Sequence, residues 1–424
     1  MTYVNCRDPA RLIGKAVAAA GLMWLALSAP LPASAADAAF ARWLEGLWPA
    51  AREMGISRRT FTAATQGLEP DLTLPDLDLP GKPTLPRGQA EFVQTPADYV
   101  KETTIARLAE QGRKLAAEHH RTLTAIEQKF GVPPNVILAI WGRETAYGSH
   151  KLPHSAVRVL ATQAYYGRRK DMFRQEFLYA LKILEEGHVK LADMRSSWGG
   201  AMGLTQLLPS EFYKYAIDFN GDGRRDVWTS VPDALASAAQ QLVAKGWQRG
   251  TRWAYEVRAP KEVDCTIGVP ENTQPIAEWL RRGYVPAHGR RPSPDELAEP
   301  ASLLQPEGTY GPAFLTLKNY YVIKDYNFSD LYVLFVGHLS DRIGDPRPFE
   351  TPWSKGQQLR SDQVETMQQT LTRLGLYQDK IDGKAGMKTR AALGAYQKAN
   401  RLKVDCWPTA AVLDHMRLMA GKIR

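Results

Sequence analysis

Long stretches of helical hydrophobic periodicity dominate this chain and limit the folds that it can adopt. In each stretch apolar residues recur every three to four positions, as on a helix with one buried face. The stretches are Phe40–Gly67, Tyr99–Phe130, Ala161–Glu186, Asp233–Lys245 and Ser329–Leu339. A chain of 424 residues can also form more than one sizeable core. The sequence therefore predicts a mainly α protein with about two or three domains.

Two segments interrupt the helical pattern and divide the chain. Residues 251–310 are rich in proline and glycine and contain short apolar runs, which indicates a small α/β insertion. The proline-bearing stretch Asp345–Lys355 is typical of a stiff linker, and a compact helical unit follows it. We therefore expect a main domain over 36–345, a linker over 346–358 and a C-terminal domain over 359–424.

The first 35 residues have the pattern of a secretory signal peptide. A basic start is followed by the apolar run Ala16–Leu27, which is short for a transmembrane helix, and by the A-x-A cleavage site Ala33–Ala35. No cysteine stands at this cleavage site, so a lipid anchor is not expected. No other segment is apolar enough to span a membrane. The sequence predicts an exported, soluble protein that is not a lipoprotein.

Two cysteines remain after removal of this signal, Cys265 and Cys406. Exported proteins commonly form disulfides, so the two could make one bond. They fall in different predicted domains, and two unpaired, buried thiols are the alternative. Both possibilities stay open at this point.

The basic charge is concentrated at the C-terminus. The formal net charge is +9, and residues 360–424 alone hold twelve Lys/Arg against six Asp/Glu, a net +6. Such an excess favours an anionic polymer as partner, although a solvated charged surface is the alternative. Nucleic acid is a poor candidate for an exported protein, whereas cell-wall polymers are both anionic and outside the cell.

The segment Pro133–Gly148 predicts a short helix that ends on a buried acid. Ile137, Ile140 and Trp141 form an apolar stripe, and Glu144 falls on the same stripe near the helix C-terminus. Burial and the negative end of the helix dipole should both raise the pKa of Glu144. A carboxyl that stays protonated suits a general acid. The alternative is a structural Glu that pairs with an Arg or Lys.

A second stretch, Ser197–Ser210, is rich in small residues that permit a close approach of the backbone to a bound molecule. Gln206 adds an amide donor and acceptor, and a tight helix junction is the alternative reading of the stretch. Together with the Glu144 helix, this stretch resembles the B-type lytic murein transglycosylases. The matching motifs, in chain order, are Trp141–Gly148, Ala161–Arg169, Gly200–Gln206 and Val322–Ser329. The resemblance runs from roughly Phe40 to Ile343.

The resemblance implies a lysozyme-like α-helical catalytic domain in a periplasmic enzyme of cell-wall remodelling. Such enzymes cleave the β-1,4 bond between N-acetylmuramic acid and N-acetylglucosamine in peptidoglycan and leave 1,6-anhydro ends. It implies that Glu144 is the single acid and base and that no cofactor is required. The implied substrate-contacting residues are Ser197, Met202, Gln206, Tyr326, Asn327 and Tyr332. A hydrolytic muramidase and a non-catalytic peptidoglycan-binding scaffold are the alternatives.

The segment Asp218–Asp226 matches the start of a calcium-binding loop. Thr229 stands where an EF-hand has a bidentate Glu, and some members of the family bind one calcium with a later Asp. The predicted ligands of a structural Ca²⁺ are therefore Asp218, Asn220, Asp222, Arg224 through its carbonyl, and Asp233. The alternative is an Asx-rich turn that closes on its own backbone.

The C-terminal unit has its own motifs, Met367–Tyr377 and Ile381–Gln397. Their pattern resembles a small three-helix peptidoglycan-binding domain over Gln363 to about Leu418. The resemblance implies peptidoglycan glycan strands as the partner of the whole chain, and no ligand contact is assigned to a single residue of this unit.

Overall fold

The computed structural model describes residues 35–79, 94–354 and 359–422. The predicted signal peptide, 1–35, lies almost wholly outside the described residues, as does the end of the predicted linker. The described part of the chain contains no helix with both the length and the hydropathy needed to cross a bilayer. The four largest cores of the described residues are those of two helical bodies, a small sheet and a C-terminal helical domain.

The first helical body is built around Phe40, Phe61, Phe173 and Phe177, which are all fully buried. Its elements are α1 (Ala35–Gly46), α2 (Trp48–Glu53), α3 (Arg58–Thr65), α9 (Ala156–Tyr166), α10 (Lys170–Glu185) and α11 (Pro209–Tyr215), with the two-stranded sheet β1 (His154–Ser155) and β2 (Arg195–Ser196). The sequence predicted one helical stretch over Phe40–Gly67. The structure breaks it into three helices, and Gly55, with φ of 78°, makes one of the turns between them.

The second helical body holds the largest core. Its helices are α5 (Pro96–Tyr99), α6 (Glu102–Glu118), α7 (His120–Phe130), α8 (Pro134–Thr145), α12 (Val231–Ala244), α15 (Lys318–Asn327) and α16 (Asp330–Gly344). The predicted helix over Tyr99–Phe130 is interrupted at His119, because α6 packs on α8 and α16 whereas α7 packs on α12. Helix α8 is buried on all sides from Val136 to Gly142.

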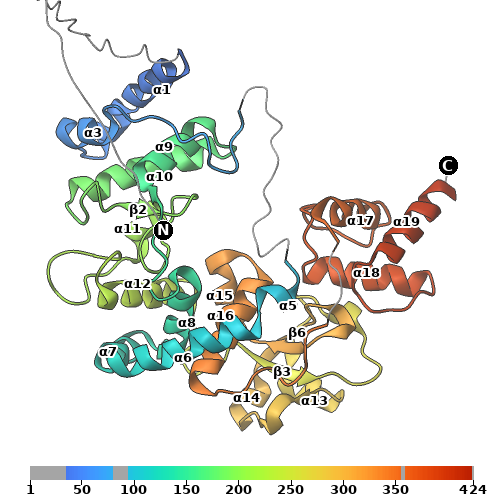
Figure 1. The fold of residues 1–424 in the computed structure, drawn as a ribbon. Helices are drawn as coiled ribbons and strands as arrows, with labels where there is room; N and C mark the ends of the chain where they lie inside the picture. Colours follow the sequence, from blue (N-terminus) through green and yellow to red (C-terminus); the bar gives the residue numbers. More distant parts are fainter. Residues whose placement is uncertain (1–34, 80–93, 355–358, 423–424) are drawn as a thin grey trace, which may run out of the picture.

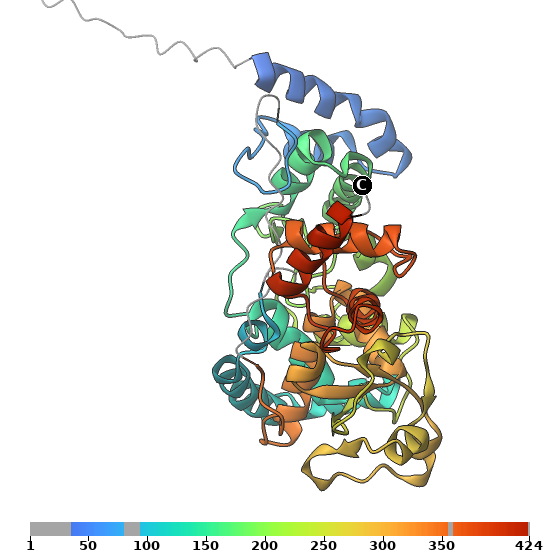
Figure 2. The same cartoon turned by 90° about the vertical axis from the view of Figure 1, so that its right-hand side faces the viewer.

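The predicted insertion is an antiparallel sheet with short helices. Its strands are β3 (Ala254–Arg258), β4 (Gln274–Pro275), β5 (Val285–Pro286), β6 (Pro300–Leu304) and β7 (Ala313–Thr316), in the order β4-β6-β7-β3-β5. The helices are η1 (Cys265–Ile267), α13 (Ile276–Arg281), η2 (Ala287–Gly289), α14 (Pro294–Ala298) and η3 (Gly308–Tyr310). Figures 1 and 2 show the first helical body at one end of the molecule and the insertion at the other. The prediction of a mainly α fold with a small α/β insertion is confirmed.

The C-terminal domain consists of α17 (Ser361–Arg373), α18 (Met387–Ala399) and α19 (Ala410–Lys422), as expected for a three-helix unit. A disulfide joins Cys406 of this domain to Cys265 of the insertion, which decides between the two readings of these cysteines. The backbone N–H of Thr309 donates to the carbonyl oxygen of Asp405, and Met387 is part of the core of the second helical body. The C-terminal domain is therefore docked on the rest of the chain.

The described part of the predicted linker packs against the insertion instead of standing free. The ring of Phe349 lies 5.1 Å from that of Phe314 on β7. The buried carboxylate of Glu256 accepts the backbone N–H groups of Glu350 and Thr351, at 3.0 and 2.8 Å. Proline favoured an extended path for this segment, but its two aromatic residues give it apolar surface to bury.

Candidate active site

Glu144 lies in the last turn of α8, and its side chain is half-buried. Pro134 occupies the first turn of this helix, where its missing N–H costs nothing. The helix ends before Gly148, at Ala146, which adopts a left-handed conformation with φ of 47°. The N–H of Ala146 then donates to the carbonyl of Gly142. This termination leaves the carboxyl of Glu144 at the boundary between the two helical bodies.

Tyr332 fixes one oxygen of this carboxyl. Its hydroxyl donates to Oε1 of Glu144 at 2.5 Å, although 188 residues separate the two in the sequence. The ring is 1% exposed and lies in the first turn of α16, whose N-cap, Ser329, accepts the N–H of Tyr332. Burial, and then the negative charge of Glu144, raise the pKa of Tyr332 well above its ordinary value. The phenol therefore stays protonated and donates at neutral pH.

Two hydrogen bonds hold the loop between β2 and α11, one to the Glu144 helix α8 and one to α15. The hydroxyl of Thr145 donates to the carbonyl of Leu204 at 2.9 Å, and that of Tyr326 donates to the carbonyl of Thr205 at 2.6 Å. Inside the loop, Met202 and Leu207 exchange backbone hydrogen bonds of 2.8 and 2.9 Å. The two motifs that the sequence singled out separately are thus neighbours in space.

The predicted substrate-contacting residues do not all present a side chain to this site. Ser197, Gln206 and Asn327 are half-buried, and the ring of Tyr326 lies nearly parallel to that of Tyr332, with 6.1 Å between the ring centroids. Gln206 adopts φ of 60°, and its amide donates to the carbonyl of Gly203. Met202, in contrast, is completely buried in the core of the first helical body. In this structure its side chain packs in that core and supports the loop.

Sequence reasoning did not single out Thr145 or the partner of Arg143. Thr145 is a buried polar residue at a helix end, which is a signal that its hydroxyl needs a hydrogen-bond partner. Arg143 directly precedes Glu144 on α8. Its guanidinium donates to the hydroxyl of Tyr99 and lies over the rings of Tyr99 and Phe335.

The predicted calcium loop closes largely on its own backbone. The carboxylate of Asp218 accepts the N–H groups of Gly221, Asp222 and Gly223. Asp233 is completely buried, and its carboxylate accepts three further N–H groups from residues of the loop. Over the described residues, no three His, Cys, Asp or Glu side chains are grouped as a metal site requires. The geometry in this conformation is that of an Asx-rich turn.

Comparison with known families decides the identity of the fold. A profile described as the transglycosylase SLT domain matches residues 39–341, which is well over half of the chain. The chain belongs to this family. A peptidoglycan binding domain profile matches residues 360–416, the three-helix unit at the C-terminus. Both resemblances that the motifs predicted are confirmed.

Three relatives in the family show how far the similarity extends. SltB3 from Pseudomonas aeruginosa, solved in complex with NAG-NAM-pentapeptide, is 36% identical with a TM-score of 0.80, covering 89% of this chain and 99% of that one. Slt35 from Escherichia coli, solved in complex with calcium, is 27% identical with a TM-score of 0.50, covering 59% and 78%. Membrane-bound lytic murein transglycosylase B of E. coli K12 is 30% identical over 231 residues, 53% of this chain and 61% of that relative's length.

Proposed function

We propose that this protein is a lytic murein transglycosylase that cleaves the β-1,4 bond between N-acetylmuramic acid and N-acetylglucosamine in peptidoglycan. The observation that carries the proposal is the contact between Tyr332 and Glu144, beside which three of the four matching motifs meet. A half-buried carboxyl with one oxygen held by a buried phenol is oriented for proton transfer to a bound sugar. The match to nearly the whole of SltB3 supports the same assignment.

In this mechanism Glu144 acts twice. As an acid it gives its proton to the glycosidic oxygen, which leaves as the 4-hydroxyl of N-acetylglucosamine. The O6 of the muramic acid then bonds to its own anomeric carbon, with assistance from the substrate's N-acetyl group. Glu144 takes the proton that O6 loses, so the 1,6-anhydro ring closes, the carboxyl is regenerated and no water is consumed.

The surrounding residues would orient the sugar and the acid. Tyr332 keeps Glu144 in place, while Ser197, Gln206 and Asn327 are half-buried and would contact the glycan with their polar groups. Tyr326 would contact the sugar with its ring while its hydroxyl holds the loop. We assign Met202 to the support of the loop, because its side chain is completely buried.

Product analysis tests the proposal against its alternatives. Purified sacculi would be digested with the protein, and the released muropeptides would be weighed by mass spectrometry. We expect muramic ends that are lighter by one water than hydrolysed ends. Reducing ends alone would mean a hydrolytic muramidase, which uses two carboxylates. No release of products, together with binding to sacculi, would mean a non-catalytic scaffold.

The proposed site of action is the periplasm. Residues 1–35 would direct export and be removed, since their basic start, apolar run and A-x-A site have the signal-peptide pattern. Residues 36–345 would form the catalytic domain, and residues 359–424 would form the domain that binds peptidoglycan. Residues 346–358 would link these two domains. The net +6 charge of residues 360–424 supports an anionic polymer as their ligand.

We also propose a weak structural Ca²⁺ at the Asp218 loop. The donors would be Asp218, Asn220, Asp222 and Asp233 with the carbonyl of Arg224, a set of hard oxygens that suits Ca²⁺. Asp218 and Asp233 each accept three N–H groups, which leaves each carboxylate about one further lone-pair site. The guanidinium of Arg224 lies 3.6 Å from the carboxylate of Asp222 and competes with a cation. These contacts support low affinity.

Calcium is expected to raise the melting temperature and to leave the chemical step nearly unchanged. A ligand that binds only the native state adds about 2.7 kcal/mol of stability at a hundredfold excess over its dissociation constant. Melting curves of the chelator-stripped protein, with and without millimolar calcium, measure the effect, and Asp218→Asn should abolish it. Equal melting temperatures and no heat in a calorimetric titration would leave the loop as an Asx-rich turn.

A further inference from the structure

Arg143 is a half-buried cation of the second helical body whose direct partners are a hydroxyl and two aromatic rings. Its guanidinium donates to the hydroxyl of Tyr99 from Nε at 3.2 Å and from Nη2 at 2.5 Å. The guanidinium also lies 4.8 Å from the centre of the Tyr99 ring and 5.0 Å from that of Phe335. No carboxylate of the described residues lies within ion-pair distance of Arg143. Its charge is therefore not neutralised by a direct partner.

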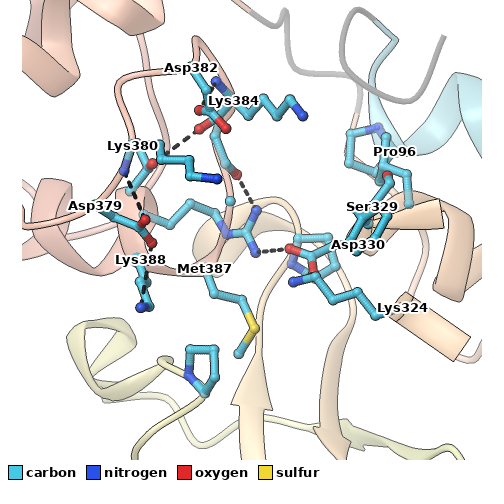
Figure 3. Close-up of a pocket in the computed structure, with 18 of the residues that line it drawn as sticks. Pro96, Lys324, Ser329, Asp330, Asp379, Lys380, Asp382, Lys384, Met387 and Lys388 are labelled. Atoms are coloured by element: carbon cyan, nitrogen blue, oxygen red, sulfur yellow. Dashed lines mark hydrogen bonds and ion pairs between the residues drawn. The ribbon is translucent and has the colours of Figure 1, made fainter. Parts of the chain in front are cut away.

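The two most deeply buried arginines of the described residues differ from Arg143 in this respect. Arg342 pairs with Glu102, and Arg390 lies 3.5 Å from Asp330. The second pair joins the catalytic and C-terminal domains, and Figure 3 shows Asp330 in that region. Because the direct neighbours of Arg143 are neutral, its charge acts on groups that lie further away.

The packing of α8 on α16 brings this charge close to the contact between Glu144 and Tyr332. Residues three apart on a helix lie on the same face, with roughly 5–6 Å between their Cβ atoms, so Phe335 and Tyr332 are neighbours on α16. Arg143 meets Phe335, and Glu144, the next residue of α8, meets Tyr332. The cation and the acid thus contact adjacent positions on one face of α16.

The electrostatics of these residues agree with their packing. Burial opposes the charge of Arg143, but Tyr99 and then Glu144 outweigh burial and raise the pKa of Arg143. Arg143 in turn acts to lower the pKa of Tyr332, against the larger effects of burial and of Glu144. The cation therefore interacts with both members of the hydrogen-bonded pair. A guanidinium stays protonated in proteins, so this interaction is present throughout the pH range of an enzyme assay.

Two phenols also lie beside Glu144. Tyr332 on α16 donates to it, and the charge of Glu144, after burial, raises the pKa of Tyr326 on α15. Glu211 on α11 acts on Tyr326 as well. On the other helices that pack on α8, charged groups act on different residues: Arg107 and Arg113 of α6 on Tyr147, His119 before α7 on Trp141, and Asp233 of α12 on the backbone of the 218–226 loop. Arg143 is therefore the cation that these contacts place next to Glu144.

We propose that the guanidinium of Arg143 stabilises the carboxylate that Glu144 becomes after it protonates the glycosidic oxygen. The neutral acid gains little from a nearby cation, whereas the anion gains the charge–charge attraction, so the proton leaves more readily. The anion lasts until Glu144 takes the proton of the muramic O6. Arg143 acts through Glu144 and is a positioning residue. Because this reaction is that of the proposed function, the inference rests on it.

The pH profile of kcat/KM on peptidoglycan tests the proposal. The test variant is Arg143→Met, which removes the charge and keeps an apolar side chain between the rings. Arg143→Gln is a second neutral variant, used if the first does not fold. A general acid is active while it is protonated, so the rate falls as the pH rises through the pKa of Glu144. Without the cation, this falling limb should move to higher pH by about one unit, the effect of one nearby opposite charge.

Two further variants separate charge from packing. Arg143→Lys keeps the charge and should leave the falling limb close to its wild-type position. Arg58→Met is the matched control, because Arg58 of α3 also lies over two rings, those of Trp48 at 5.0 Å and Phe61 at 5.5 Å, in the first helical body. It should leave the profile unchanged. A limb that stays in place in a folded neutral variant, or that moves as far in Arg143→Lys, would overturn the proposal.

Unfolding measurements decide the same question without turnover. The difference in unfolding free energy between a chain with Glu144 and its Glu144→Gln counterpart changes only between the pKa values of Glu144 in the folded and unfolded states. The end of this range that the folded state sets should lie about one pH unit higher with Arg143→Met than with Arg143. The same range in both backgrounds would overturn the proposal. If the wild-type chain does not cut peptidoglycan, the proposed function fails, and these curves still decide whether Arg143 acts on Glu144.

Discussion

Replacing Glu144 by Gln is expected to lower kcat on peptidoglycan by at least about 10²-fold, the scale of a lost general acid. The amide keeps the shape of the side chain and can still meet the hydroxyl of Tyr332, so the fold should be retained. It has no proton to give to the glycosidic oxygen. Initial rates on sacculi, with a melting curve of each protein, make the measurement.

Glu211→Gln is the matched control for this experiment. Glu211 is the other carboxylate whose charge contributes to the raised pKa of Tyr326, after burial and Glu144. In the structure it accepts the backbone N–H of Leu208 and caps α11. We expect Glu211→Gln to keep most of the turnover. An equal loss in both variants would instead favour a two-carboxylate, hydrolytic mechanism. Near wild-type turnover of Glu144→Gln would contradict the assignment of Glu144 as the general acid.

The helices could be predicted from the sequence because their apolar stripes are local. Periodicity located α8, α12 and the start of α16 to within a few residues, but it predicted one helical stretch over Ala161–Glu186 where the structure has α9 and α10, separated at residues 167–169. It could not show that Tyr99–Phe130 forms two helices, because the break at His119 follows from packing on different partners. The C-terminal end of α8 also lies before its predicted position, because it too depends on contacts with other parts of the chain. The predicted segment extended to Gly148, yet the chain turns at Ala146, where φ of 47° carries a cost that the surrounding contacts must offset.

The sequence could nominate members of the candidate site but not the contacts between them. Position on an apolar stripe singled out Glu144, and the resemblance to a family supplied Tyr326 and Tyr332. The hydrogen bond from Tyr332 to Glu144 joins residues 188 positions apart, and no local pattern reports such a pair. The family resemblance implied substrate contact for both Gln206 and Met202, which lie in one loop. Only the structure shows that Gln206 is half-buried whereas Met202 is completely buried.

The attachment of the C-terminal domain was the least predictable feature. The prolines after Asp345 indicated a separating linker, whereas Phe349 packs on β7 and the Cys265–Cys406 disulfide joins two domains. Cysteine pairing depends on the distance between backbones, which composition does not contain. The docking of the C-terminal domain also brings Asp330 and Arg390 together as an ion pair. The sequence shows only two charged residues that are 60 positions apart.

Asp330→Asn is expected to destabilise the fold by about 3–5 kcal/mol, the cost of breaking a buried ion pair by removing one partner. The carboxylate accepts the hydroxyl of Tyr320 at 2.6 Å and pairs with Lys324 and Arg390. The asparagine would leave the buried Arg390 cation without its anion. Urea denaturation of the full chain measures the loss. In the exposed pair Asp414–Arg417, Asp414→Asn should cost no more than about 1 kcal/mol.

The stability that Asp330 contributes should also depend on pH. Burial opposes its ionisation, but Lys324 and then Arg390 outweigh burial and lower the pKa of Asp330 from its ordinary 3.8 to about 2. A carboxyl whose pKa is lower in the folded than in the unfolded state binds fewer protons when folded. Its contribution, about 2 kcal/mol, is therefore present above pH 3.8 and is lost as the pH falls through about 2. The difference in stability between the wild-type chain and Asp330→Asn should thus shrink by about 2 kcal/mol between pH 4 and about 2, and a constant difference over this range would contradict the role of Asp330 as a buried anion.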